Sequence, residues 1–240
     1  MSQSRPLGPK LVDWRPPPAP GGTPLVGRYA RLDRLDADRH AGDLHRAMSG
    51  DASLWDYMPY GPFSSASQYH RWAREAAAGT DPLFYAITDL DAGQVCGVAS
   101  YLRIKPNAGS IEAGHINLAP ALQRTRAATE AFYLMMDWAF GAGYRRFEWK
   151  CDALNMPSRR AAQRLGLSYE GTFRQATVVK GRNRDTAWFA TIDTEWPALK
   201  EAFGFWLGPA NFDAEGRQRE RLGALTRLVR VTSDPVQNGG

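Results

Sequence analysis

The sequence predicts an α/β protein with one mixed central β-sheet flanked by helices. The chain has 240 residues, of which 43% are hydrophobic, enough for one domain with a sizeable core. Its patterns run in the order helices, three strands joined by short turns, helix, strand, helix and hairpin. Short turns predict an antiparallel meander, and strands separated by a helix predict a parallel centre.

Three segments are expected along the chain. Residues 1–24 are rich in Pro and Gly and predict an arm without regular structure. Residues 25–200 form the expected domain, and residues 201–240 a helical extension and tail, including an amphipathic stretch at 219–230. Within the domain we expect, in order, a strand at 25–35, helices at 36–50 and 64–79, strands at 83–90, 94–104 and 109–118, a helix at 126–140, a strand at 144–153, a helix at 156–166 and a hairpin around 181–184.

Local signals support these elements. Asp36 is a good N-cap and Gly50 a stop for the first helix, while Gly166 ends the last helix of the domain. The segments 91–93 ("DAG") and 106–109 ("PNAG") have the composition of hairpin turns. Residues 51–63, rich in aromatic side chains, are expected to form a loop between the first two helices.

Composition limits the function classes. No apolar run is long enough to span a membrane, and the first residues lack the apolar core of a secretory signal, so we expect a cytoplasmic protein. Cys96 and Cys151 lie in strand-like stretches without metal-ligand spacing, which predicts buried reduced thiols and no metal site. The net charge of +5 suits an anionic ligand such as a nucleotide or phosphate, and also nucleic acid.

The turn before the 126–140 helix carries unusual charge. Arg124 and Arg126 stand where the helix begins, followed by the small residues Ala127 and Ala128. A helix N-terminus presents unpaired N–H groups and a positive dipole end, so the turn suits a phosphate. The alternative is that both arginines are simply solvated on the first helical turn.

Two segments together indicate a family. Residues 123–131 read "QRTRAATEA" and residues 155–167 read "NMPSRRAAQRLGL". In order and spacing, the chain resembles the GNAT acyl-CoA-dependent N-acetyltransferases over about residues 25–200, specifically the Rim-type branch that acetylates ribosomal-protein N-terminal alanine. The resemblance implies a GNAT-like domain and acetyl-CoA as co-substrate.

It also implies which residues bind the co-substrate. The loop at 123–128 would cradle the CoA pyrophosphate, and the backbone of the strand at 109–118 would hold the pantetheine arm and polarise the thioester. The implied set is Asn117, Leu118, Gln123, Arg124, Arg126, Ala127, Ala128, Thr129, Asn155, Ser158 and Arg160. Asn155 and Ser158 are also good helix-capping residues, and the two roles are compatible.

The sequence departs from the family pattern twice. Arg126 stands where the family has a glycine, and Ala162 stands where many members place a tyrosine that protonates the leaving thiolate. Arg126 can replace close backbone approach by a direct charge contact with phosphate. The Rim-type branch often lacks the tyrosine.

Two residues are candidates for catalysis. By resemblance, Glu112 lies on the strand where related enzymes carry a glutamate that removes the amine proton through water, and His115 follows three residues later. In a regular strand the two side chains point to opposite faces, but a bulge, favoured by Gly114, would bring them to one side. The alternatives are a solvent-facing carboxylate and a packed or surface histidine.

The sequence therefore predicts an N-acetyltransferase that moves an acetyl group from acetyl-CoA to a primary amine, either a protein N-terminus or a small molecule. The aromatic loop at 55–63 would shape the acceptor pocket or simply pack in the core. One alternative is a non-catalytic acyl-CoA sensor, favoured by Ala162 and Arg126. Another is a nucleic-acid-binding module, disfavoured because the arginines are spread along the chain. No membrane partner is expected, and a homodimer is left open.

Overall fold

The computed structural model describes residues 5–237 and contains an eight-stranded mixed sheet. The strand order is β1-β2-β3-β4-β5-β6-β8-β7, and every neighbouring pair is antiparallel except β5 and β6, which are parallel. The expected meander with a parallel centre is confirmed. The strands are β1 (Leu25–Val26), β2 (Ala30–Arg34), β3 (Leu83–Asp89), β4 (Gln94–Lys105), β5 (Ser110–Leu118), β6 (Arg146–Asp152), β7 (Ser168–Val179) and β8 (Arg182–Ile192).

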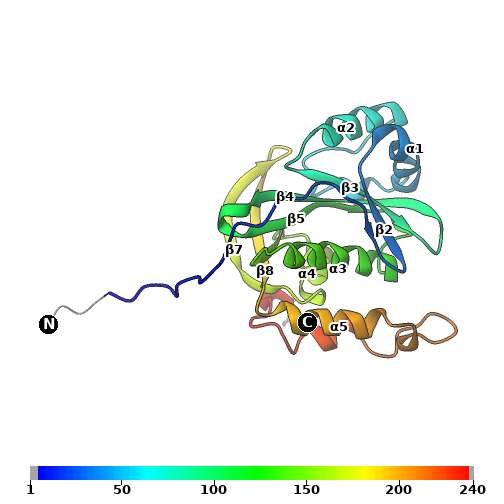
Figure 1. Cartoon of the computed structure of the whole chain (residues 1–240). Coiled ribbons are helices and arrows are strands. Elements are labelled where there is room, and N and C mark those ends of the chain that lie inside the picture. The colour runs from blue at the N-terminus through cyan, green and yellow to red at the C-terminus, as the bar shows by residue number, and fades with distance from the viewer. Residues whose placement is uncertain (1–4, 238–240) are drawn as a thin grey trace.

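Helices cover the sheet on both faces. Helices α1 and α2 lie on one face, and α3 and α4 lie on the other with α5 below them (Figure 1). The helices are α1 (Ala37–Met48), α2 (Ala66–Ala78), α3 (Arg126–Gly141), α4 (Met156–Arg164), α5 (Trp196–Leu207) and the short α6 (Leu222–Thr226).

Side-chain caps set the helix starts. Asp36, Ser65, Thr125 and Asn155 each accept a hydrogen bond from the backbone N–H three residues ahead, as N-caps of α1, α2, α3 and α4. The expected cap at Asp36 is confirmed. Each cap satisfies one of the N–H groups that a helix start leaves without an intrahelical acceptor.

The core lies on both faces of the sheet. Tyr69 of α2 is buried against one face, and Tyr101 is buried on the opposite face, where its hydroxyl donates to the Met135 carbonyl 2.7 Å away. Cys96 and Cys151 are free and buried, as expected. Burial raises the pKa of the Cys151 thiol to about 11, so this thiol stays protonated at neutral pH.

The C-terminal segment folds back onto the domain. The amphipathic stretch at 219–230 is helical only at 222–226, so the prediction of a longer helix there is wrong. The physical reason is tertiary: the Thr226 hydroxyl donates to the carbonyl of Arg164 at the end of α4, 3.0 Å away. Further along, Asp234 forms a buried ion pair with Arg159 of α4, at 2.5 Å between Nη2 and Oδ1.

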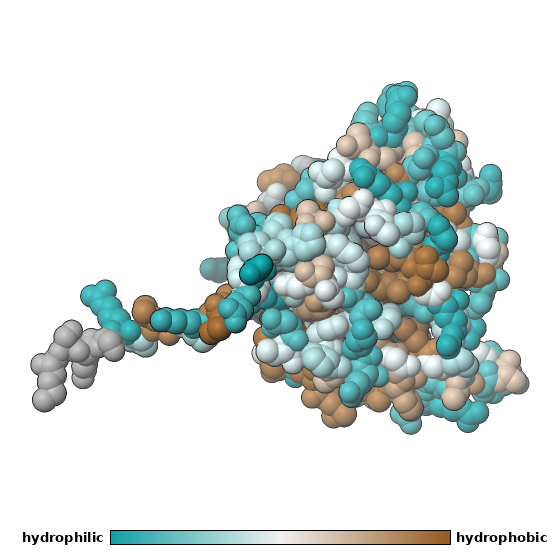
Figure 2. All heavy atoms as spheres, in the orientation of Figure 1, coloured by the Kyte–Doolittle hydropathy of each residue, from teal (hydrophilic) through white to brown (hydrophobic). Residues whose placement is uncertain are grey.

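The N-terminal arm has two parts. Its first described residues are exposed and extend away from the domain (Figures 1 and 2). Nearer the domain it is anchored, because the Tyr144 hydroxyl donates to the Pro18 carbonyl at 3.1 Å and Arg145 lies over the Trp14 ring. The arm therefore reaches the sheet at the end where β5 and β6 begin.

Candidate active site

The centre of the site is a gap between the parallel strands β5 and β6. Residues 110–113 of β5 pair with residues 146–149 of β6, and no pairing follows although both strands continue. The strands separate because β5 bulges: Gly114 pairs with Ser100 and Asn117 with Val98, so three steps on β5 match two on β4. His115 lies in the bulge with φ of 50°, an uncommon conformation for a residue other than glycine. We call this opening the β5–β6 gap.

His115 points from the bulge toward the aromatic loop. Its Nδ1 lies 3.2 Å from the Tyr60 hydroxyl, and its ring is near the ring of Phe84. Burial, together with the charge of Arg103, lowers the pKa of His115. Because the usual value is about 6.5, this imidazole is neutral at pH 7. A neutral imidazole with one free nitrogen can accept a proton.

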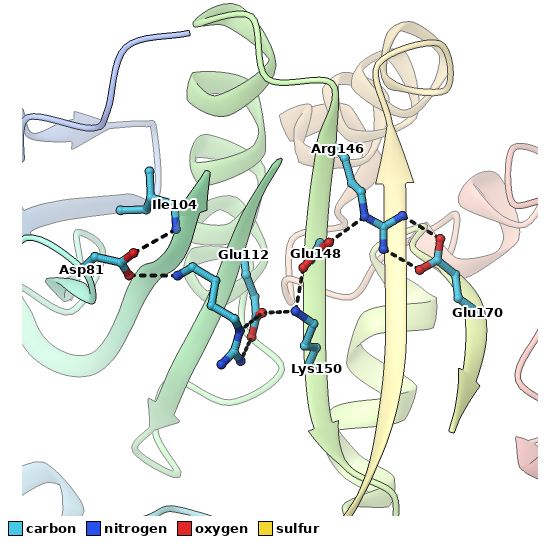
Figure 3. A network of polar contacts seen from close by, with 8 residues as sticks. Asp81, Ile104, Glu112, Arg146, Glu148, Lys150 and Glu170 are labelled. Carbon is cyan, nitrogen blue, oxygen red and sulfur yellow. Dashed lines mark hydrogen bonds and ion pairs between the residues drawn. The ribbon is translucent and has the colours of Figure 1, made fainter. Parts of the chain in front are cut away.

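Glu112 lies at the centre of a run of ion pairs across the sheet (Figure 3). Its carboxylate accepts two hydrogen bonds of 2.6 Å from Arg103 and lies 2.7 Å from Nζ of Lys150. Lys150 also contacts Glu148, which continues the run to Arg146. The run ends at Glu170, which accepts from Arg146, while Asp81 accepts from the backbone N–H groups of Arg103 and Ile104.

The two charged groups at the centre of this run are buried. Glu112 is only 1% exposed, and the side chain of Lys150 is 6% exposed. An ideal Cβ on Gly114 would lie 3.5 Å from a Glu112 oxygen, so residue 114 faces the same side as Glu112. The sequence carries no local signal for this network, because its charged side chains come from different strands and only the pairing of these strands brings them together.

The turn before α3 leaves backbone N–H groups available. The Thr125 hydroxyl accepts a hydrogen bond from the N–H of Ala128, and Arg124, in the turn, has a φ of 65°. Within residues 5–237, the backbone N–H groups of Arg126 and Ala127 have no hydrogen-bond acceptor. The Gln123 side chain donates to the Leu118 carbonyl at 3.0 Å, which ties the turn to the end of β5. The geometry matches an anion-binding helix start.

The two arginines of this turn differ. Arg124 is exposed, whereas Arg126 lies 3.2 Å from a carboxylate oxygen of Asp91 and over the rings of Tyr29 and Phe212. The guanidinium of Arg126 therefore points toward the β3–β4 turn. Thr129, in the first turn of α3, accepts a hydrogen bond from Arg164 of α4, which connects the two helices.

The start of α4 lies on the other side of the gap. Asn155 caps the helix through the N–H of Ser158, and the Ser158 hydroxyl accepts from the Trp149 indole at 2.9 Å. Arg160 is exposed on the first turn of the helix. Ala162 is fully buried, so the helix presents no side-chain hydroxyl at that position.

Two contacts that the sequence did not indicate enclose the gap. Nζ of Lys180, at the tip of the β7–β8 hairpin, donates to the Trp55 carbonyl at 2.8 Å. The Tyr57 hydroxyl donates to the Leu154 carbonyl in the β6–α4 loop at 3.2 Å. Each contact joins residues about a hundred positions apart. The hairpin, the aromatic loop and the β6–α4 loop thus contact one another beyond the paired part of β5 and β6. We call the region that these three segments border the chamber.

Two searches of the described residues are negative. No group of three or more His, Cys, Asp or Glu side chains in residues 5–237 is arranged to hold a metal ion. No described helix is both long and apolar enough to cross a membrane.

The splayed strand pair β5 and β6 thus lies beside two capped helix starts, those of α3 and α4. The family model described as acetyltransferase (GNAT) domain matches residues 31–168. The chain therefore belongs to the GNAT acetyltransferase family, and the resemblance stated from the sequence is confirmed. No curated protein sequence matches the chain.

Solved structures agree with this assignment. A GCN5-related N-acetyltransferase from Brucella melitensis is 44% identical, with a TM-score of 0.88, and the match covers 90% of this chain and 100% of that one. A GNAT-family structure from Chromobacterium violaceum ATCC 12472 is 42% identical, with a TM-score of 0.76 and coverage of 82% and 100%. The RimL ribosomal L7/L12 α-N-protein acetyltransferase in complex with coenzyme A shares the fold at 21% identity, with a TM-score of 0.60 and coverage of 70% and 97%.

Proposed function

We propose that this protein transfers the acetyl group of acetyl-CoA to a primary amine by direct attack in the β5–β6 gap. The observation that carries the proposal is the bulge at His115, which opens the gap beside the turn before α3. The amine nitrogen would form a bond to the acetyl carbonyl carbon as the carbon–sulfur bond breaks. The products would be an amide and free CoA, with one proton removed from the amine.

The co-substrate would be held by the residues on both sides of the gap. The backbone of Asn117 and Leu118 would pair with the pantetheine arm, since the edge of β5 that faces β6 has no strand partner there. The pyrophosphate would meet the free N–H groups at the start of α3, with Gln123, Arg124, Arg126, Ala127, Ala128 and Thr129 around it. Asn155, Ser158 and Arg160 would contact the arm from α4.

We assign the proton transfer to His115, with Glu112 in support. Both oxygens of the Glu112 carboxylate already accept from Arg103, and one of them also contacts Lys150, so neither oxygen is free of a cationic partner. His115 is neutral and partly exposed at the gap. The negative charge of Glu112 favours the imidazolium that forms when His115 accepts the proton.

A free-thiol assay tests the proposal. The protein is incubated with acetyl-CoA and a panel of primary amines, and the release of CoA thiol is followed together with the mass of each acceptor. Thiol release that depends on the amine supports the enzyme. A protein that CoA stabilises against heat, but that releases no thiol with any amine, would instead be an acyl-CoA sensor.

A further inference from the structure

The chamber beyond the gap contains an arginine without an anionic partner. Lys150 pairs with Trp188 in the β6–β8 register and lies 3.8 Å from the centre of the Trp188 ring. Strand β8 keeps its register with β6 from Trp188 to Thr186, and the irregularity between Phe173 and Thr177 adds its extra residues to β7. Trp188 and Arg184, four residues apart on β8, therefore lie on the same face. Arg184 therefore shares the sheet face that carries Glu112 and Lys150.

Arg184 differs from the other cations on this face. Arg103, Lys150 and Arg146 each contact at least one carboxylate. Within residues 5–237, Arg184 forms no ion pair and no side-chain hydrogen bond, and its Nε is buried without an acceptor. A half-buried guanidinium is rarely left without an anion, because its desolvation is then uncompensated.

Two more buried donors lie on the same face without acceptors. They are Nε1 of Trp188 and Nδ2 of Asn117. The bulge places residues 114 and 117 opposite Ser100 and Val98. Because Ser100 and Val98 are two residues apart on β4, they lie on one face, and Asn117 therefore faces the same side as residue 114. The face therefore offers three unpaired N–H donors, one of them cationic. A ligand that matches it supplies acceptors and negative charge.

Arg184 lies in the chamber. Asp152, the last residue of β6, pairs with Thr186, so Arg184 lies just beyond the end of β6, beside the loop that Tyr57 contacts. The charge of Arg184 acts on both sides of the gap, since it contributes to lowering the pKa of His115 and opposes the burial that raises the pKa of Cys151. His115 lies on this face as well, because its ring contacts that of Phe84, which pairs with Ser100.

We infer that the acceptor is an amine that carries a carboxylate close to the amino group, as a free amino acid does, and that Arg184 binds this carboxylate while the amine meets His115. The inference rests on the proposed function and narrows its acceptor class. It favours a small molecule over a protein N-terminus, whose first amino group has a peptide carbonyl in place of the carboxylate. A charge-assisted pair with Arg also fixes the direction from which the amine enters.

A substrate panel tests the inference. The value of kcat/KM is measured for free α-amino acids, for their primary amides and methyl esters, and for short peptides with amidated C-termini. The variants are Arg184→Gln and, as a matched control, Arg182→Gln, an exposed arginine on the same strand. We expect the wild type to prefer acid over amide by about 10- to 100-fold. Arg184→Gln should remove that preference without changing KM for acetyl-CoA, and Arg182→Gln should retain it.

Three results would overturn the inference. In the first, the wild type acetylates amides as well as acids. In the second, Arg184→Gln lowers kcat/KM equally for acids and for amides. In the third, Arg184→Gln raises only KM for acetyl-CoA, which would make Arg184 a co-substrate contact. A binding experiment distinguishes failure of this inference from failure of the proposed function. N-acetyl amino acids are titrated into the CoA-bound protein by calorimetry. If no amine is acetylated, the enzyme proposal fails. Binding of the N-acetyl amino acid that is lost in Arg184→Gln would still support the carboxylate site. Absence of this binding in the wild type would reject the carboxylate site.

Discussion

The Tyr60 hydroxyl lies 3.2 Å from Nδ1 of His115, and the two rings are nearly parallel, at 8°. Burial raises the pKa of Tyr60, so it remains a neutral hydroxyl. When Nδ1–H donates to the Tyr60 oxygen, Nε2 of His115 keeps its lone pair free to accept a proton. The aromatic loop thereby positions the histidine of the bulge.

His115→Gln should lower kcat by about a hundredfold to ten-thousandfold while CoA binding is retained, because it removes the proton acceptor but not the gap. In the wild type, kcat/KM should fall as the pH drops through the lowered pKa of His115, with a midpoint below about 6.5. The variant should lose this acidic limb. Tyr60→Phe, which removes only the hydrogen-bond partner of Nδ1, should lower kcat less than His115→Gln does. An unchanged limb in His115→Gln would assign the proton to another group.

Glu112→Gln should lower turnover and move the acidic limb to lower pH, because Glu112 favours the protonated form of His115. If Glu112 is itself the base, as the family resemblance suggests, the limb should disappear instead. The substitution also removes the anion between Arg103 and Lys150, so the free energy of unfolding should fall by roughly 1–3 kcal/mol.

The control for this variant is Glu148→Gln, which removes another carboxylate that Lys150 contacts. Chemical denaturation should show both variants destabilised, and steady-state kinetics should show a large loss of turnover in Glu112→Gln alone. Equal losses of turnover would mean that Glu112 acts only through folding.

Arg126→Ala should weaken CoA by about 10- to 100-fold and leave phosphate-free pantetheine binding unchanged, if the guanidinium exchanges Asp91 for the pyrophosphate. Asp91→Ala removes the same ion pair without removing the positive charge, so its CoA affinity should not fall. Calorimetric titration measures both. Equal losses for CoA and pantetheine in Arg126→Ala would limit Arg126 to its contacts with Asp91, Tyr29 and Phe212.

Asp234→Asn should lower the free energy of unfolding by about 3–5 kcal/mol at pH 7, because Arg159 would keep a buried charge without its counter-ion. Asp213→Asn, which breaks the exposed contact with Arg217, should lower the free energy of unfolding far less. Urea denaturation compares the two variants. A similar small effect in both would show that the C-terminal segment contributes little to the domain.

The same pair predicts a pH dependence. Burial raises the pKa of Asp234, but hydrogen bonds from Arg159, Gln237 and the Val236 N–H outweigh it, so the pKa lies below its usual value. A lowered pKa in the folded state means that the stabilisation is complete above the unfolded value of about 3.9 and is lost as the pH falls through the folded value. The difference in stability between wild type and Asp234→Asn should therefore persist to about pH 4 and shrink below it.

The sequence predicted those parts of the fold that depend on local chemistry. Asp36 caps its helix because a short polar side chain reaches the backbone three residues ahead, and Asn155 does the same at the start of α4. The turn at 106–109 ends in Gly109, whose φ of 67° suits glycine. The two segments that carry the family resemblance, 123–131 and 155–167, were recognisable because each is a short contiguous motif.

The contacts that define the site join distant residues and carry no local signal. Lys180 and Trp55 are 125 residues apart, and Arg159 and Asp234 are 75 apart. The bulge at His115 was only favoured by Gly114, because its existence depends on the register with β4. The amphipathic pattern at 219–230 predicted too long a helix, since packing on α4 outweighs propensity there.

The most direct test is a crystal structure of the protein with a non-hydrolysable acetyl-CoA analogue. We expect the pantetheine between β5 and β6, hydrogen-bonded to the backbone of Asn117 and Leu118, with the pyrophosphate at the start of α3. The acetyl carbonyl should face His115 in the bulge. An analogue bound elsewhere, or a gap closed by direct pairing of β5 with β6 beyond residues 113 and 149, would contradict it.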